Sequence, residues 1–396
     1  MKKRLSLVAL VVAALFVLSA CDGEQADNGV VLRVSESLGG PDEFIIEAGQ
    51  RFNELHPHIT VEFVNVEIGS AAADIEVDGP LGIGPDVFVA PHDQIGRLVA
   101  GGHILPVADP AAVRAAVFDS AIIAATAEGV IYGYPIAMET YALFYNRDLI
   151  ASDEVPATFE ELKEWVSAFN ADNPDMFGFM FEIGAYYTIL FTTADGNRLF
   201  GPDGEDRVNT NINSPSSVMG MEFMQSLREI LDVDAGDLTG AFVDAAFTAG
   251  HTAMHITGPW NIAPFLGYGI DFGVTTIPAL PGDANPPASF AGVRTVFVSS
   301  FTNHPEESHM FAEFLISREM QQLRYQITGA IPSTDIPTES PHFAGFLRQM
   351  EYAFPMPSIP EMGAYWAAMD AASSNIWNGM DVQEQLDMVH QAIVGE

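Results

Sequence analysis

Apolar and polar positions repeat along the chain in an order of strand, helix, strand. Residues 30–37 (VVLRVSES) and 59–66 (ITVEFVNV) are rich in β-branched side chains and predict strands. The apolar residues between them that share one helical face are Phe44, Ile45, Ala48, Phe52 and Leu55. The pattern returns as a short apolar strand at 86–90 and a helix that ends at Gly101. We therefore predict successive units in which a helix links two strands.

A long extended segment separates these units from a second set. Residues 129–150 (GVIYGYPIAMETYALFYNRDLI) are aromatic-rich and long enough to cross from one domain to another. The pattern then restarts with a helix in which Thr158 and Glu161 form a capping box. Its predicted buried face consists of Leu162, Trp165, Val166 and Phe169.

The second half of the chain continues the alternation. The predicted strands are 178–183, 252–257, 271–280 and 292–300. The predicted helices are 214–231, 239–250, one long helix over 304–328, a helix around Tyr365 and a last one over 382–394. Strands that alternate with helices in this way are typical of an α/β protein, here with two sheets.

The N-terminus has the pattern of an export signal. Lys2, Lys3 and Arg4 precede an apolar run and then the small residues of LSAC, so residues 1–20 are interpreted as a lipoprotein signal peptide. Cys21, the single cysteine, stands where lipidation would occur, and residues 21–29 read as a polar tether. We expect a lipid anchor that holds the chain on the outer face of the cytoplasmic membrane, in an extracellular or periplasmic space.

Charge excludes one large class of partner. The formal net charge is −37, and loss of the three basic signal residues makes it −40 (−37 − 3). Nucleic acid is therefore excluded as a partner. Lys163 is the only lysine after the signal, so the surface is an acidic shell, for which adaptation to high salt is the simplest hypothesis.

Motifs of catalysis, metal binding and cofactor binding are absent. The chain has no G-x-S-x-G, no H-E-x-x-H, no Walker loop and no G-x-G-x-x-G after a strand. His251 and His255 are four residues apart, but the segment reads as a strand, where that spacing does not bring two side chains together on one metal. We expect no catalytic residues, no metal and no cofactor.

Aromatic residues instead stand at turns and beside polar residues. Trp260 follows the Gly-Pro corner of ITGPW, Tyr186 lies at a strand-to-helix transition, and Trp366 enters a helix. Flat rings with acidic or amide neighbours suit sugars, which have an apolar face and a rim of hydroxyls. Taken singly, each ring is more often part of a core than a ligand platform, at roughly two to one.

Six segments link these residues, because in order along the chain they resemble the maltose/maltodextrin-binding proteins of bacterial ABC importers. The segments are GPDVFVAPHDQIG, YPIAMETYALFYNRDL, AYYTILFTTADG, AFTAGHTAMHITGPW, DFGVTTIPALPG and PSIPEMGAYWAAM. The resemblance implies a two-lobed clamshell of the periplasmic-binding-protein type, with the ligand in the cleft. Its implied N-terminal lobe is 30–137 with 295–331, its C-terminal lobe 141–292 with 334–396, and its hinges 137–141, 292–295 and 330–334.

The resemblance also implies a binding site. Trp260, Trp366 and Tyr186 fall on aromatic platforms of the family, and Asp93 and Glu139 on carboxylates that bind hydroxyls. Glu36 and Ser37 fall near a further polar contact. The departures from the family pattern are Ala90 or Pro91 for a tryptophan, Gln94 for an arginine, Gly184 for a glutamate and Ala367 for an aromatic. Gln94 is still expected to contact the ligand from its position beside Asp93.

The predicted function is the capture of a maltodextrin-like α-glucoside and its delivery to ABC permease subunits in the membrane, by a monomer without enzymatic activity. Sugar binding is expected to close the clamshell. Two alternatives remain open from the sequence. One is the same scaffold with a different oligosaccharide or a non-sugar solute, and the other is a lipid-anchored enzyme that acts on polysaccharide.

Overall fold

The computed structural model describes residues 29–202, 204–337 and 340–395. The signal peptide 1–20, Cys21 and the tether up to residue 28 lie outside the described residues. Among the described residues, no helix has the length and apolar character needed to cross a membrane.

The first lobe, called the N lobe here, is built on a six-stranded sheet of order β12-β11-β3-β1-β2, in which β6 also pairs with β11. Its strands are β1 (Val30–Glu36), β2 (Ile59–Asn65), β3 (Val87–Pro91), β6 (Gly133–Glu139), β11 (Phe290–Val298) and β12 (Phe354–Pro355). β1 runs parallel to β2 and β3, whereas β11 runs antiparallel to β3 and β6. Its helices are α1 (Pro41–Leu55), α2 (Ala71–Asp78), α3 (Ile95–Ala100), α4 (Pro110–Ala116), α5 (Asp119–Ala124), α11 (Pro305–Leu315) and α12 (Arg318–Thr328). A small ribbon of β4 (Thr126–Ala127) and β5 (Val130–Ile131) completes it.

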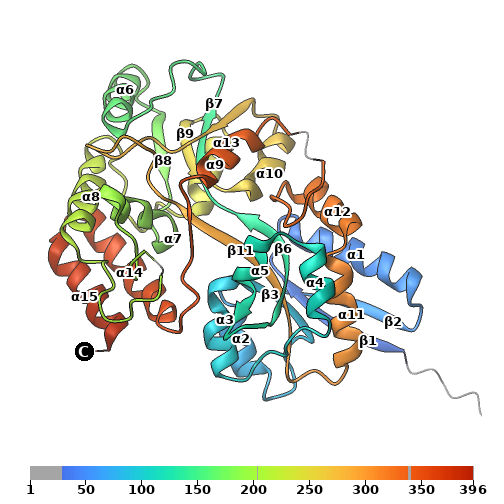
Figure 1. The fold of residues 1–396 in the computed structure, drawn as a ribbon. Helices are drawn as coiled ribbons and strands as arrows, with labels where there is room; N and C mark the ends of the chain where they lie inside the picture. Colours follow the sequence, from blue (N-terminus) through green and yellow to red (C-terminus); the bar gives the residue numbers. More distant parts are fainter. Residues whose placement is uncertain (1–28, 203, 338–339, 396) are drawn as a thin grey trace, which may run out of the picture.

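The second lobe, called the C lobe here, is built on a four-stranded sheet of order β10-β7-β9-β8. Its strands are β7 (Ala142–Asn146), β8 (Phe177–Phe181), β9 (Thr252–Thr257) and β10 (Phe272–Thr275). Its α-helices are α6 (Phe159–Asp172), α7 (Ala185–Thr188), α8 (Pro215–Ser226), α9 (Gly240–Thr248), α10 (Ile262–Gly267), α13 (Phe343–Met350), α14 (Met362–Trp377) and α15 (Val382–Val394). In Figure 1 the two sheets lie in separate halves of the molecule, each flanked by its own helices.

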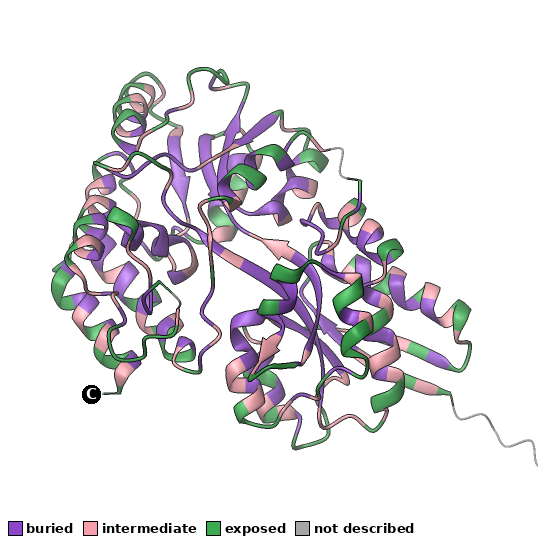
Figure 2. Ribbon diagram, viewed as in Figure 1, coloured by how far each residue is buried: buried purple, intermediate pink, exposed green. Residues whose placement is uncertain are grey.

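The central strands of both sheets are buried and purple in Figure 2, whereas the outer strand β2 is partly exposed, and each lobe has a core of its own. The N-lobe core lies between β1, β3 and the buried faces of α1 and α11. The C-lobe core joins β8 and β9 to α14 and α15 around the fully buried Trp377. Two separate cores allow the lobes to move as units.

The chain passes between the lobes at several points. β6 ends at Glu139 and β7 begins at Ala142, so a two-residue link joins the two sheets. β11 begins at Phe290, whose ring packs in the C-lobe core, and continues into the N-lobe sheet. A further bridge pairs Met138 with Ile331. The predicted segments 137–141, 292–295 and 330–334 lie at these places, and their hinge role stays a prediction.

Side-chain N-caps mark the starts of α4, α6, α8, α9, α12 and α15. The capping box of α6 is present, because the Thr158 hydroxyl accepts the Glu161 N–H and the Glu161 side chain accepts the Thr158 N–H. Leu162 and Val166 are buried as predicted, while Trp165 and Phe169 are half-buried and stack with 4.9 Å between ring centroids.

Two expectations from periodicity are wrong. The long helix over 304–328 is two helices, because Ser317 is extended (φ −60°, ψ 150°) and its hydroxyl accepts the Met320 N–H as the N-cap of α12. Leu55 is 64% exposed, since it is the last residue of α1 and lies beyond Phe52, the end of the buried face.

Candidate functional site

A cavity of about 760 Å³ lies between the lobes, within the usual size range of small-ligand sites. The N lobe contributes Ser37, Leu38, Gly39, Pro41, Glu67, Ile68, Gly69, Pro91, Asp93 and Gln94. The C lobe contributes Glu182, Gly184, Ala185, Tyr186, Tyr187, Trp260, Asn261, Pro264, Trp366 and Asp370. The segments that cross between the lobes contribute Glu139, Gly292, Val293, Arg294 and Met356. The structure thus brings together seven of the eight predicted ligand contacts, all except Glu36.

One wall of the cavity is aromatic. Tyr186 and Tyr187 stand on α7, Trp260 on a 3-10 turn (Pro259–Asn261) and Trp366 on α14. The Tyr186 and Trp260 ring centroids are 6.2 Å apart. All four aromatic residues in the described lining belong to the C lobe.

The corner at Gly258-Pro259 explains the position of Trp260. A Cβ on residue 258 would lie 2.1 Å from the indole ring, so only glycine lets the ring fold against its own turn. The Asn261 amide donates to Thr257 Oγ1 and to Asp244 Oδ1, both at 2.8 Å, which ties the turn to β9 and α9. Trp260 is half-buried, so it packs on the C-lobe core and also lines the cavity.

A hydrogen bond joins the two lobes across the cleft. Trp366 Nε1 donates to Asp93 Oδ2 at 3.0 Å, and the Gln94 amide donates to the same oxygen. Burial raises the pKa of Asp93 to about 6, although the bonds from Trp366 and Gln94 act to lower it. Asp93 Oδ1 is buried and has no hydrogen-bond partner among the described residues, so it is available to accept a ligand hydroxyl.

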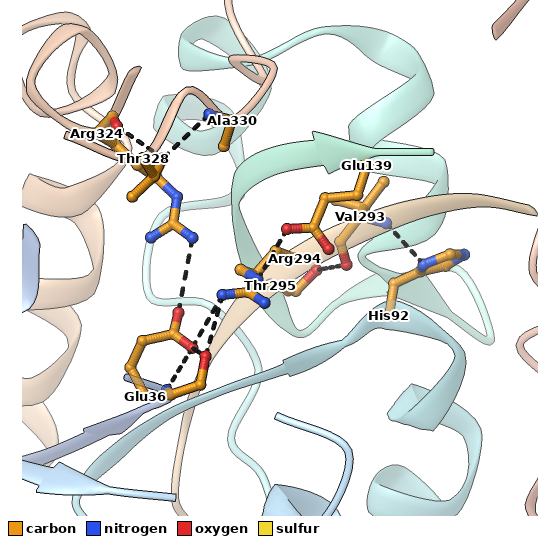
Figure 3. Close-up of polar contacts among 10 residues, drawn as sticks. Glu36, His92, Glu139, Val293, Arg294, Thr295, Arg324, Thr328 and Ala330 are labelled. Atoms are coloured by element: carbon orange, nitrogen blue, oxygen red, sulfur yellow. Dashed lines mark hydrogen bonds and ion pairs between the residues drawn. The ribbon is translucent and has the colours of Figure 1, made fainter. Parts of the chain in front are cut away.

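Glu139 and Ser37 line the cavity, but Glu36 does not. The Glu36 side chain is 0% exposed and lies behind Ser37 at the end of β1, where it holds Arg294 (Figure 3). Arg294 Nε forms an ion pair with Glu139 Oε1 at 3.0 Å. The predicted ligand contact at Glu36 is therefore corrected to a buried partner of an arginine.

Three carboxylates of the site, those of Glu67, Glu182 and Asp370, were missed by sequence reasoning. Asp370 lies one turn after Trp366 on α14, a spacing that places both on one face, and Asp370 Oδ1 accepts the Ala185 N–H at 2.7 Å. A Cβ on Gly184 would lie 3.4 Å from Asp370 Oδ1 and 3.9 Å from Glu182 Oε1. Burial, with the charges of Asp244 and Asp370, raises the pKa of Glu182 to about 7.

Ala90 and Pro91 are the two residues that stand where the maltodextrin-binding pattern has a tryptophan. Ala90 is fully buried in β3, and Pro91 is the residue that reaches the cavity. At this point the cavity is therefore lined by a proline and not by an aromatic ring.

The structure offers little for a metal. Among the residues described, no three His, Cys, Asp or Glu side chains are grouped so as to hold an ion. His255 is buried in β9, where its Nε2 lies 2.8 Å from Asp244 Oδ1.

With this geometry established, comparison with known proteins gives consistent matches. The profile of the family described as bacterial extracellular solute-binding protein matches residues 36–322. A galactooligosaccharide-binding protein of Bacillus subtilis (strain 168) is 29% identical over 100% of this chain and 98% of its own. A maltooligosaccharide ABC transporter solute-binding lipoprotein of Streptococcus pneumoniae (serotype 4, strain ATCC BAA-334 / TIGR4) is 27% identical over 81% of this chain and 78% of its own.

Two solved structures agree in fold. The Thermus thermophilus maltotriose-binding protein with maltotriose bound superposes with a TM-score of 0.84 at 27% identity, covering 92% of this chain and 99% of that one. A cyclo/maltodextrin-binding protein in complex with maltotetraose superposes with a TM-score of 0.75 at 30% identity, covering 92% and 96%. The α/β periplasmic-binding-protein fold is therefore confirmed.

Proposed function

Because the chain belongs to the bacterial extracellular solute-binding proteins, we propose that it captures a maltodextrin-like α-glucoside in its cleft and presents it to the permease of an ABC importer. At the coarser level, it is an extracellular, non-enzymatic solute-binding component for oligosaccharides. The polysaccharide-acting enzyme is accordingly set aside.

The observation that carries the proposal is a cavity with an aromatic wall and carboxylates around it. Four aromatic residues line one side, where sugar rings can stack, and carboxylates line both lobes and the crossing segment, among them Asp93 and Glu139. Ionised carboxylates accept hydrogen bonds from hydroxyls. The names of the maltooligosaccharide and maltotriose relatives support an α-glucoside.

A galactooligosaccharide is the second candidate. The relative that matches the full length of the chain carries that name. Pro91 also offers no plate where the maltodextrin pattern has a tryptophan, so this cleft holds a ring less firmly at that point.

A calorimetric and thermal-shift panel tests the proposal. The purified chain is titrated with maltotriose, maltotetraose, a β-linked galactotriose, cellotriose, a polyamine and divalent metals. A ligand at 100 times its dissociation constant stabilises the native state by about 2.7 kcal/mol, so the right sugar raises the melting temperature. Preference for galactotriose would select the second candidate, and a response to amines or metals alone would overturn sugar binding.

The lipid anchor at Cys21 is part of the same proposal. We expect the full-length chain expressed in a bacterial host to fractionate with membranes and Cys21→Ala to be released into the medium or periplasm, as immunoblotting of the fractions would measure. Membrane retention of the variant would contradict lipidation. The protein is proposed to act as a monomer, which light scattering can check.

A further inference from the structure

We propose that Arg294 is a fixed hydrogen-bond donor for a hydroxyl of the bound sugar, and that Glu36 and Glu139 hold it in that position. This inference rests on the proposed function, and it adds a specificity-determining residue to the same cleft. None of the sequence motifs pointed to Arg294.

The cavity is rich in acceptors and poor in charged donors. Its carboxylates are those of Glu67, Asp93, Glu139, Glu182 and Asp370. Arg294 carries the one basic side chain in the described lining. A sugar hydroxyl both donates and accepts, so a site built of carboxylates satisfies only half of its bonding capacity. Arg294 supplies the missing half with a charged N–H group.

The side chain is held on two sides. Arg294 lies in β11 between β3 and β6, paired with Pro91 and Ala137. Its Nη1 donates to Glu36 Oε1 at 3.2 Å, and its Nε forms the ion pair with Glu139 at 3.0 Å (Figure 3). The residue is 7% exposed, yet it lines the cavity.

One end of the guanidinium remains free for a ligand. Nη2 makes no hydrogen bond to any described residue, whereas Nη1 donates to Glu36 and Ser37 and Nε faces Glu139 as an ion pair. Nε is a buried nitrogen without a hydrogen-bond partner, but Nη2 is not among these buried atoms, so Nη2 is the nitrogen that a ligand hydroxyl in the cavity can reach.

The charge of Arg294 is balanced inside the protein. Glu36 Oε2 lies 3.7 Å from Arg324 Nη2, so two arginines face two glutamates in one network. Burial acts to lower the pKa of Arg294, but Glu139 and Glu36 outweigh it, and the pKa is raised. The guanidinium stays charged and neutralised, which suits a neutral hydroxyl. An acidic sugar would instead meet the surplus of carboxylates around it.

The test compares the wild type with Arg294→Met by calorimetry, using whichever of maltotriose and galactotriose the wild type binds, and its monodeoxy analogues. We expect Arg294→Met to lose about ten- to a hundredfold in affinity. One deoxy analogue should bind the wild type more weakly than the parent sugar does, whereas Arg294→Met should bind the analogue and the parent sugar with equal affinity. Such a loss of discrimination would mean that Arg294 contacts the missing hydroxyl directly. If Arg294 had only a structural role, the variant would still discriminate between the two sugars.

Arg324→Met is the matched control. Arg324 belongs to the same network and is 2% exposed, but it does not line the cavity. It should lower the melting temperature and keep the discrimination against the deoxy analogue. If circular dichroism shows that Arg294→Met is unfolded, Arg294→Lys replaces it, since a lysine cannot keep both glutamate contacts and reach the same hydroxyl.

The two failures are distinguishable. A wild type that binds no sugar of the panel overturns the proposed function. Suppose instead that the wild type binds sugar, and that a folded Arg294 variant keeps its affinity within twofold and its full sensitivity to every deoxy analogue. That result overturns the role of Arg294 alone. Equal binding of a uronic-acid trisaccharide and its neutral counterpart to the wild type would contradict the charge argument.

Discussion

At the scale of a single residue, Trp260 contacts two environments, the C-lobe core and the cavity. One side of the indole packs on the C-lobe core, and the other lines the cavity. Trp260→Ala should weaken sugar binding by about 1 to 3 kcal/mol, the scale of a lost aromatic stacking contact. We expect the unliganded protein to lose only a few degrees of melting temperature. A large loss of stability with intact affinity would make Trp260 a core residue instead.

Glu182 should make stability depend on pH. Its pKa is raised to about 7 in the folded state, above the ordinary value of 4.5, so the native state holds a proton that the unfolded chain releases. This contribution is fully present below pH 4.5 and is lost as the pH rises toward 7. Glu182→Gln should therefore gain about 3 kcal/mol on the wild type at pH 8 and nothing near pH 4, as denaturant unfolding would measure. A difference independent of pH would contradict the raised pKa.

At the scale of elements, helix α8 depends on a glycine. A Cβ on Gly220 would lie 1.8 Å from the Phe191 carbonyl oxygen, which is backbone and cannot move aside. Helix propensity alone predicts that Gly220→Ala gains about 1 kcal/mol. Overpacking outweighs this, so we expect a net loss of about 2 kcal/mol in the free energy of unfolding.

The control for Gly220→Ala is Gly363→Ala. Gly363 lies in the first turn of α14, and a Cβ added there would meet no described atom within 4 Å. That variant should be neutral or slightly stabilised. If both variants change the free energy of unfolding alike, helix propensity and not packing determines the effect of Gly220→Ala.

Many of the helices and strands could be predicted from the sequence, because strands and capped helices have local sequence signals. The break at Ser317 was missed since Phe311, Leu315, Met320 and Leu323 keep an apolar face on both sides of it. The site was predictable where a resemblance tied residues to turns, as for Trp260 and Trp366. Arg294 and Glu182 carry no such signal, because only the pairing of strands distant in sequence brings them to the cleft.

At the scale of the whole molecule, a hydrogen bond between Trp366 and Asp93 links the lobes across the cleft. Trp366→Phe keeps an aromatic plate but removes the Nε1–H that Asp93 accepts. We expect the unliganded variant to have a larger radius of gyration by small-angle X-ray scattering, because the open form gains population. Sugar should still close it, at roughly tenfold lower affinity. Trp165→Phe is the control, since Trp165 lies on α6 outside the described lining, and it should change neither the radius of gyration nor the affinity. If Trp366→Phe has the same radius of gyration as the wild type, the Trp366–Asp93 bond does not contribute to closure.

The one-sided aromatic wall has a consequence for the order of events in time. Every aromatic ring of the described lining is on the C lobe, so a sugar can stack there while the cleft is still open, before any N-lobe group reaches it. Substitutions of the rings should then slow association, whereas loss of Asp93 or Ser37 should mainly hasten dissociation. The N lobe acts as the half that retains the sugar, and its reopening sets how quickly the cargo can be handed over.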